Sequence, residues 1–565
     1  MRLGLWNWFS VELEASECAE LKQLLVDRTT LEGSECEDFC RLLWMCRIIA
    51  ADQRVVWEHL SASFTDTFRH SVDQWNEQLA VKVLRARVDS MDDAEVALQL
   101  REKLERHLTA ALKPMTATLP RVELRDAAKR AGDCPYMVVP AAEGAEGSLV
   151  CSAPLPAFGE LLRIPRERMF FVDTVVKYSE LGRAVQSSAE LSSMLNGEEP
   201  LLVLALIYER HVAATSHWSE LLASCPSVYP TVPGFWDWDD LAELEGLDIL
   251  DDVLAKRAQL VQFHEEIKAV LPFIYEALEG RSALERDEFL GCFTVETVMW
   301  ARATFDSRAF NLNIDGRVVL ALVPVADMIN HGNRSNVLVR KVEPDGGDFV
   351  MQVGASLTAE DVGLELWMSY GPLQNWELLQ FYGFVIEDNE HDKLPFPFNV
   401  PESDTADVWE ERRASLVAKY GLHLVGRCWI GYDGCPPAAL IALLRVHLAE
   451  AEEFDMMERN SPFAMVGADT ERRVVDTVSE TIHCILELSG TSLEEDERLL
   501  EADAQMGVHN EDAEDAGALS NNRRLGIVLR LGLKRIAYRT LEWCAAAFAA
   551  LETENSSGGS DKHNE

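Results

Sequence analysis

Strand-like sequence in this chain is confined to two stretches, and helical periodicity fills most of the sequence around them. The first stretch runs from Tyr136 to Thr174 and the second from Arg317 to Met368; both consist of short apolar runs. Helical patterns occupy residues 1–125, about 178–300 and 395–550. This distribution predicts small sheets separated by helical regions. At 565 residues the chain also exceeds one ordinary hydrophobic core, so about two to four structural units are expected.

The outer helical regions carry clear helix signals. Val96, Leu100 and Leu104 form a four-residue apolar stripe in the N-terminal region, which predicts an amphipathic helix. In the C-terminal region, Ser492 followed by Glu495 is a capping-box pattern that predicts a helix start. The polar, Pro-bearing stretch 387–407 is typical of a linker. The Gly/Ser-rich residues 556–565 predict a disordered tail.

The charge balance restricts the partners of the chain. Its 52 Lys and Arg residues against 95 Asp and Glu residues give a formal net charge of −43. Such a deficit argues against a chain that neutralises nucleic-acid phosphates or lies on anionic lipid. It is compatible with a well-solvated surface, or with a preference for basic partners. We therefore expect no nucleic-acid and no membrane partner.

Targeting and metal signals are weak. The first ten residues are followed at once by Glu12, Glu14 and Glu17, which fits neither a secretory signal nor a transit peptide. No apolar run reaches the roughly 18 residues of a membrane span. A cytoplasmic or nuclear protein is expected.

The 12 cysteines include no Cys-x-x-Cys pair, so neither a structural zinc site nor a disulfide framework is predicted.

The sequence that carries chemistry lies in the second strand-like stretch. An apolar run ends in Asp327-Met328-Ile329-Asn330-His331. Downstream come Tyr370-Gly371, then Asn375-Trp376-Glu377-Leu378-Leu379, then Tyr382-Gly383-Phe384. Taken singly, an Asn-His pair or a Tyr-Gly pair is a weak signal, and a lone His331 is more often structural than functional.

Taken together and in order, these blocks resemble the SET-domain methyltransferases, and within them the Rubisco large-subunit methyltransferase-like branch. The similarity extends to Ser307-Arg308-Ala309-Phe310, to the Trp218–Trp236 stretch, and to 491–496 and 530–535. It covers about residues 140–545. The resemblance implies an α+β fold: a SET domain of small β-sheets over 126–386, split by a helical insert at about 178–300. An all-α substrate-binding domain would follow over 395–550. Residues 1–125 lie outside the resemblance, and their helical periodicity alone predicts a helical N-terminal extension.

The resemblance also implies roles for individual residues. S-adenosylmethionine would be the cofactor, held by Asn330 and His331, with Arg308 pairing with its carboxylate and Glu160 and Leu162 giving main-chain contacts. Tyr370 resembles the catalytic tyrosine of the family. The acceptor side chain would enter a channel bordered by Ser307, Phe310, Asp327 and Tyr382. No metal is implied.

The residue types suit methyl transfer. In-line displacement at a sulfonium needs a neutral nucleophile about 3–3.5 Å from the carbon. A lysine must first lose its proton, at roughly 4–5 kcal/mol at pH 7. An aromatic channel disfavours the ammonium by desolvation, and a tyrosine hydroxyl can orient the amine.

The chain departs from the family pattern at three places. Ser148 stands where the second glycine of a Gly-x-Gly loop is usual, and glycine permits close approach of the backbone to a ligand. Gln374 replaces a usual serine and Trp376 a usual alanine.

The resemblance implies a protein-lysine N-methyltransferase that acts on a non-histone protein, and we expect it to be a monomer. Zinc-bearing histone enzymes of this fold place cysteines just after the Tyr382 position, and no cysteine occurs here between Cys292 and Cys428. A histidine acceptor remains an alternative within the class. A SET-derived binding module that has lost catalysis is the alternative from another class, supported by the altered glycine loop.

Overall fold

The computed structural model describes most of the chain beyond its N-terminal region. The residues described are 38–50, 74–89, 91, 94–111, 135–139, 147–195, 197–278, 282, 284–332, 335–343, 347–354, 356–398, 408–420, 422, 427–507 and 519–557. The Gly-x-Gly position is therefore described only from Gly147 onward.

Three helices represent the N-terminal extension: α3 (Asp38–Ala50), α6 (Gln74–Asp89) and α7 (Ala94–Ala111). They share a small apolar core that includes Leu43, Leu84 and Leu104, the last from the predicted stripe. The helical prediction for the remainder of 1–125 lies outside the described residues. The extension meets the next domain at Phe158, whose ring lies 3.7 Å from the guanidinium carbon of Arg85.

The sheets are small, as the sequence predicted. A five-stranded sheet has the order β3-β8-β7-β9-β6, and two antiparallel pairs, β1-β2 and β4-β5, flank it. The strands are β1 (Tyr136–Val139), β2 (Ser148–Cys151), β3 (Glu160–Ile164), β4 (Ala309–Ile314), β5 (Arg317–Leu322), β6 (Asn330–His331), β7 (Val337–Val342), β8 (Phe349–Val353) and β9 (Trp367–Met368). Strands β4 and β5 are joined by Asp315-Gly316, both with positive φ, the geometry of a tight two-residue hairpin turn.

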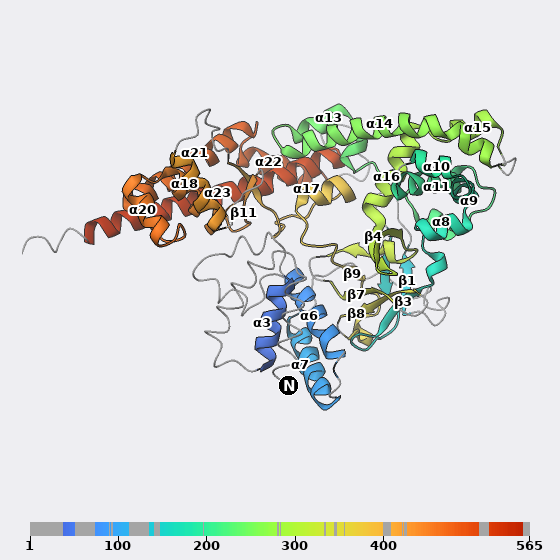
Figure 1. Ribbon diagram of the computed structural model, residues 1–565, viewed down its shortest axis with the longest axis horizontal. Helices are drawn as coiled ribbons and strands as arrows, with labels where there is room; N and C mark the ends of the chain where they lie inside the picture. Colours follow the sequence, from blue (N-terminus) through green and yellow to red (C-terminus); the bar gives the residue numbers. More distant parts are fainter. Residues whose placement is uncertain are drawn as a thin grey trace, which may run out of the picture.

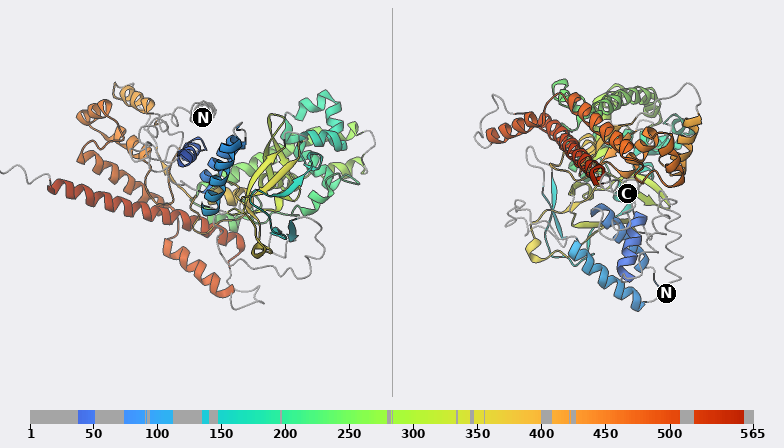
Figure 2. Two further views of the ribbon diagram at one scale, coloured as in Figure 1. Left: turned by 90° about the horizontal axis from the view of Figure 1, so that it is seen from below. Right: turned by 90° about the vertical axis from the view of Figure 1, so that its left-hand side faces the viewer.

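The helical insert separates β3 from β4. Its helices are α8 (Val172–Tyr178), α9 (Glu180–Ser187), α10 (Ala189–Leu195), α11 (Glu198–His211), α12 (Ser219–Ser224), α13 (Trp238–Leu241), α14 (Asp248–Ala277), α15 (Arg286–Gly291) and α16 (Val295–Arg308). The dense apolar segment of α11 is the centre of its core, beside the fully buried Trp218. Figure 2 shows the sheets lying between the N-terminal helices and the insert helices.

The C-terminal region is helical, as expected, but it also contains a sheet. Its helices are α18 (Val408–Lys419), α19 (Ala438–Leu448), α20 (Ala451–Arg459), α21 (Ala468–Leu488), α22 (Leu493–Gly507) and α23 (Asn521–Ser557). Ser492 and Glu495 exchange the two predicted capping hydrogen bonds, of 3.1 and 2.8 Å.

Two local predictions for this region were wrong. Leu394–Pro397, expected in a linker, forms strand β10, which pairs with β11 (Arg427–Ile430). A linker assignment overlooked the alternation of Leu394 and Phe396, both buried, with more exposed neighbours. Helix α23 also continues through Ser557, two residues into the expected tail, and the rest of the tail lies outside the described residues.

Helix α23 joins the C-terminal region to the insert. It runs from the outer edge of the C-terminal helices to beneath α13 and α14 (Figure 1). Its basic residues are all engaged with protein groups: Arg523 and Arg530 with Glu243, Arg524 with Asp503, Lys534 with Asp496, Arg535 with Asp388, and Arg539 with the carbonyl of Tyr432. The basic cluster is therefore part of an interface within the chain.

Candidate active site

Two short parallel strands bring the main motifs together. Asn330 pairs with Trp367 and His331 with Met368, although the strands are far apart in sequence. The chain leaving β9 then places Tyr370 beside the histidine ring. The main-chain N–H of Tyr370 donates to Nδ1 of His331 at 3.0 Å, and the two rings lie 5.1 Å apart. The structure thus joins three of the predicted site residues.

The hydroxyl of Tyr370 has a fixed orientation. It donates to the main-chain carbonyl of Ile329, with an O–O distance of 2.9 Å, while the side chain is half-buried. A phenolic oxygen has one proton to donate and lone pairs that accept. Because the proton points at Ile329, the lone pairs are directed away from this carbonyl and can accept a hydrogen bond from another group.

The same arrangement fixes the tautomer of His331. Its side chain is buried, and Nδ1 accepts from the backbone of Tyr370. A neutral imidazole that accepts at Nδ1 carries its proton on Nε2. His331 therefore presents an N–H at Nε2.

Aromatic rings pack beside Tyr370 and His331. The ring of Tyr382 lies 4.8 Å from that of Tyr370, and the ring of Phe384 lies 6.1 Å from His331. Tyr382 ends the π-helical turn η6 (Leu378–Tyr382), a conformation often found at functional sites. Gly383 follows with φ 77°, and a Cβ there would lie 2.4 Å from Oγ1 of Thr231. Glycine is required at this position, because it lets the chain redirect Phe384 toward the site.

Two further predicted site residues, Arg308 and Asp327, form an ion pair with each other. Nη1 of Arg308 lies 3.0 Å from Oδ2 of Asp327, whose side chain is completely buried. Burial raises the pKa of Asp327, although the guanidinium opposes this effect. Burial also disfavours the charge of Arg308, but the carboxylate outweighs it and the pKa of Arg308 is raised. We regard the pair as ionised at neutral pH, since a guanidinium does not lose its proton and the bond is direct.

Glu365 is a site residue that the sequence analysis did not identify. It accepts a hydrogen bond of 2.8 Å from Nδ2 of Asn330, and burial raises its pKa. The neighbouring Leu366 donates its N–H to the carbonyl of Leu149, so the segment after Ser148 reaches the same place. A carboxylate directly before the buried Leu366, within a strand-like run, was the signal that could have indicated it.

The remaining predicted residues lie at different places. Leu162 and Glu160 belong to β3, at the sheet edge opposite β6; Leu162 is buried, and Glu160 pairs with Arg163 in solvent. Ser307 donates its hydroxyl to the carbonyl of Ala303 within its own helix. Phe310 is buried, with its ring 5.5 Å from that of Phe349. Their assigned roles remain proposals.

A second polar cluster supports the segment that follows Tyr370. Asn375 begins the short helix α17 (Asn375–Glu377) and donates two hydrogen bonds to the carboxylate of Asp392, from its main chain at 2.6 Å and its side chain at 2.7 Å. Its side-chain oxygen accepts from Ile386 at 2.7 Å. Burial raises the pKa of Asp392 to about 7. These bonds hold together the chain between Tyr370 and the C-terminal region.

A groove runs along α14 close to this cluster. Its volume is about 470 Å³, and its lining includes Lys256, Phe263, Trp376 and Phe381. Phe381 directly precedes Tyr382, so the groove approaches the aromatic rings of the site. Within the part of the chain that the structure describes, no helix is long and apolar enough to cross a membrane, and no three His, Cys, Asp or Glu residues gather as a metal site.

Comparison with solved structures identifies the fold. The chain matches the SET domain of LSMT bound to lysine and AdoHcy, with a TM-score of 0.56 and 18% identity, over 77% of this chain and 94% of that one. Rubisco LSMT bound to AdoMet matches with a TM-score of 0.54 and 19% identity, over the same shares. These matches confirm the predicted SET fold with its helical C-terminal region.

Sequence comparisons agree with this assignment. Residues 405–536 match the family model described as Rubisco LSMT substrate-binding. Actin-histidine N-methyltransferase of Canis lupus familiaris is 25% identical over 400 residues, which is 68% of this chain and 62% of that protein. The Homo sapiens protein of the same name is 25% identical over 68% of this chain and 61% of its own length. The chain therefore spans less than two thirds of the length of these relatives. The resemblance to the Rubisco methyltransferase-like branch is confirmed.

Proposed function

We propose that this chain, with its SET fold and its Rubisco LSMT substrate-binding region, is an S-adenosylmethionine-dependent protein N-methyltransferase, and that its acceptor is lysine. The observation that carries the proposal is Tyr370. Its hydroxyl is held by Ile329 and its backbone by His331, and its ring packs beside that of Tyr382. This geometry leaves a positioned acceptor of hydrogen bonds where a nucleophilic nitrogen can be oriented.

The residues assigned to the cofactor have groups that suit it. Arg308 makes one hydrogen bond to Asp327, which leaves other N–H groups of its guanidinium for a carboxylate. Oδ1 of Asp327 is buried, and no hydrogen bond of standard geometry reaches it within the described residues. His331 carries its proton on Nε2, and Asn330 lies beside it on β6. S-adenosylmethionine, when bound, supplies an electrophilic methyl group on sulfur.

The chain's own residues account for the proposed step on the acceptor. The oxygen of Tyr370 accepts a hydrogen bond from an N–H of the substrate side chain. This bond orients the substrate nitrogen so that the lone pair of the nitrogen points toward the methyl carbon. Tyr382 and Phe384 exclude water from this nitrogen. Exclusion of water disfavours the ammonium form of a lysine, which supports its deprotonation.

Two observations point to different acceptors. Phe310 and Ala326 belong to the apolar cluster against which Tyr370 packs, and neither offers a hydrogen bond to the second nitrogen of an imidazole. These apolar side chains favour contact with the long methylene chain of a lysine acceptor. The names of the relatives, actin-histidine N-methyltransferases, support histidine as the second candidate. Actin is therefore a suitable first protein to assay, together with acceptor peptides containing either residue.

We expect the rate to depend steeply on pH. For a lysine acceptor of pKa about 10.4, kcat/KM should rise about tenfold per pH unit between pH 7 and 9, because only the neutral amine reacts. For a histidine acceptor of pKa about 6.5, it should change less than about twofold over the same range. The measurement is kcat/KM for matched peptides that differ only in Lys or His. A flat profile with transfer to the histidine peptide would overturn the lysine assignment.

Cofactor binding tests the assignment of Arg308. We expect Arg308→Ala to weaken S-adenosylmethionine binding at least tenfold by calorimetry, since it removes a charge-assisted pair. It should also lower stability by ~3–5 kcal/mol, because Asp327 is left buried and unpaired.

The double variant Arg308→Ala/Asp327→Asn separates these effects. It removes the unpaired charge, so stability should return while cofactor affinity stays low. Normal cofactor binding by either variant would show that the site is misassigned. Absence of cofactor binding by the unchanged protein would favour the non-catalytic binding module instead.

A further inference from the structure

The side chain of Asn375 closes a loop of chain that contains two aromatic residues of the candidate site. Its Oδ1 accepts a hydrogen bond of 2.7 Å from the main-chain N–H of Ile386, and its Nδ2 donates at 2.8 Å to the main-chain carbonyl of the same residue. Tyr382 and Phe384 lie within this loop. Because Tyr370 comes shortly before Asn375, one side chain joins the segment of Tyr370 to the segment of its aromatic neighbours.

A carboxamide suits this pair of bonds, because it presents an acceptor oxygen and two N–H donors, whereas a carboxylate only accepts. The second N–H of Asn375 Nδ2 donates at 2.7 Å to Oδ2 of Asp392. Oδ1 of Asp392 accepts the main-chain N–H of Asn375 at 2.6 Å. The two residues are only 1% and 3% exposed, so losing one partner would leave the other buried and unpaired.

Helix α23 holds the far side of the segment 386–392. Arg535 pairs with Asp388 at 2.9 Å. Gly532 lies against Asp392, where an added Cβ would be 3.2 Å from Oδ2 of the carboxylate. The segment that receives these hydrogen bonds is therefore itself fixed by the C-terminal region.

We propose that Asn375, held by Asp392, is a positioning residue for methyl transfer. It keeps the ring of Tyr370 at its separation of 4.8 Å from the ring of Tyr382, and so keeps the Tyr370 oxygen where it orients the substrate nitrogen. Asn375 acts through these two tyrosines and not on the substrate itself. The inference rests on the proposed function, because it explains how the proposed hydrogen bond of Tyr370 is aimed.

The test interchanges the two side chains. Asn375→Asp sets two carboxylates against each other, and Asp392→Asn sets two N–H groups against each other. The double variant Asn375→Asp/Asp392→Asn again places a donor opposite an acceptor. Burial raises the pKa of Asp392 to about 7, so rates are measured at about pH 8.5, where its carboxylate is ionised.

Turnover should follow this pairing. With whichever of the matched Lys and His peptides the unchanged protein methylates, the single-turnover rate should fall about tenfold in Asp392→Asn and about 10²-fold in Asn375→Asp. It should recover at least about tenfold in the double variant relative to Asn375→Asp. The affinity for S-adenosylmethionine should stay within about threefold of the unchanged protein, because the residues assigned to the cofactor lie on other segments.

Asn522→Asp is the matched control. Nδ2 of Asn522 also donates at 2.7 Å to an aspartate, Asp240, but this pair lies outside the segments that carry Tyr370 and Tyr382. The change again sets two carboxylates against each other, so it should lower the melting temperature and leave the single-turnover rate unchanged.

Fluorine NMR provides a readout that does not require activity. Labelling with 3-fluorotyrosine marks the 10 tyrosines, and Tyr370→Phe and Tyr382→Phe assign the two site signals. Both signals should shift in Asn375→Asp, return toward their original positions in the double variant, and stay in place in Asn522→Asp. Asp392→Asn, the milder change, gives the same comparison if Asn375→Asp does not fold.

Unshifted tyrosine signals, or a double variant as slow as Asn375→Asp, would refute the positioning role. A rate loss of the same size in Asn522→Asp would show that the effect is one of general stability. If the unchanged protein methylates neither peptide, the proposed function fails, while the fluorine signals still decide whether Asn375 positions Tyr370.

Discussion

Replacing Tyr370 with phenylalanine is expected to lower turnover about 10²-fold or more. The change keeps the ring that packs beside His331 and Tyr382 and removes only the hydroxyl. That hydroxyl is the group that we expect to orient the acceptor nitrogen. Cofactor affinity should be nearly unchanged, because the proposed cofactor contacts come from Arg308, Asn330 and His331. The measurements are single-turnover rate, cofactor affinity and melting temperature of the same variant.

A matched control separates chemistry from stability. Tyr420 also donates its hydroxyl to a main-chain carbonyl, that of Asn460, at the same distance of 2.9 Å, but it lies in the C-terminal region. Tyr420→Phe and Tyr370→Phe should therefore have similar small effects on melting temperature, while only Tyr370→Phe slows turnover. A normal rate in Tyr370→Phe would refute the mechanism and leave the fold assignment intact.

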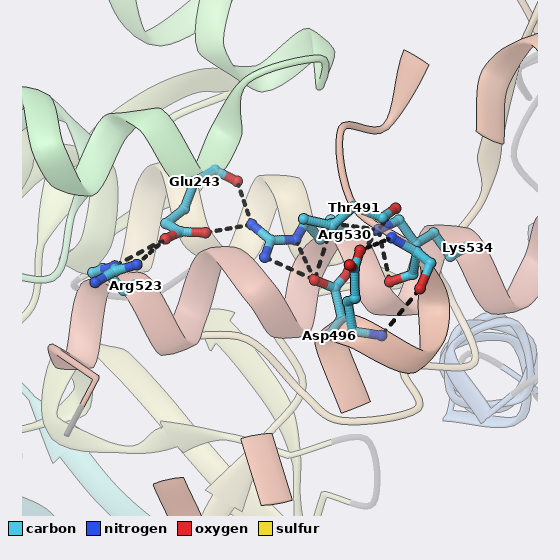
Figure 3. Close-up of polar contacts among 8 residues, drawn as sticks. Glu243, Thr491, Asp496, Arg523, Arg530 and Lys534 are labelled. Atoms are coloured by element: carbon cyan, nitrogen blue, oxygen red, sulfur yellow. Dashed lines mark hydrogen bonds and ion pairs between the residues drawn. The ribbon is translucent and has the colours of Figure 1, made fainter. Parts of the chain in front are cut away.

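Replacing Asp496 with alanine is expected to destabilise the protein by ~3–5 kcal/mol. The side chain of Asp496 is completely buried and pairs with both Arg530 and Lys534, at 2.7 Å each (Figure 3). Without the carboxylate, two cations that are themselves 8% and 3% exposed remain buried with one acidic partner, Glu243. Chemical denaturation of the full chain measures the loss.

The pH dependence gives an independent check on Asp496. Burial alone would raise its pKa, but hydrogen bonds from Arg530 and Lys534 outweigh burial and lower the pKa below the ordinary value of 3.8. A carboxyl group whose pKa is lowered on folding stabilises the folded state above its unfolded pKa. This contribution disappears as the pH falls from about 4 through the lowered value. Asp496→Ala should therefore lose less stability than the unchanged protein over that acidic range.

The exposed ion pair of Asp455 with Arg412 provides the comparison. Asp455→Ala should change stability little, because solvent screens this pair. If Asp496→Ala were no more harmful than Asp455→Ala, the interface between α23 and the insert would not depend on its charges. Glu243 belongs to the insert and Asp496 to α22, so the charge network joins the insert to the C-terminal region. We therefore expect Asp496→Ala to weaken mainly the packing between these two parts.

The sequence by itself determined most of the elements, and it contained the motif on which the proposed chemistry rests. Short apolar runs between Gly and Pro residues predicted β2, β3 and β5, and helical periodicity predicted the regions around them. Ser492 and Glu495 marked a helix start that the structure confirms. These features are local, since propensity, capping and periodicity act between residues close in sequence. The order of the motifs also carried the resemblance to the SET fold.

Only the tertiary structure decided which groups meet. Parallel pairing of β6 with β9 placed the Tyr370 backbone on His331, and no local pattern specifies that register. The same is true of Arg308 with Asp327, and of the basic residues of α23, whose partners only the structure shows. Partners of buried charges come from distant segments, because burial must be compensated wherever the chain packs. The sequence shows which residues can ionise, and packing alone determines which of them must pair.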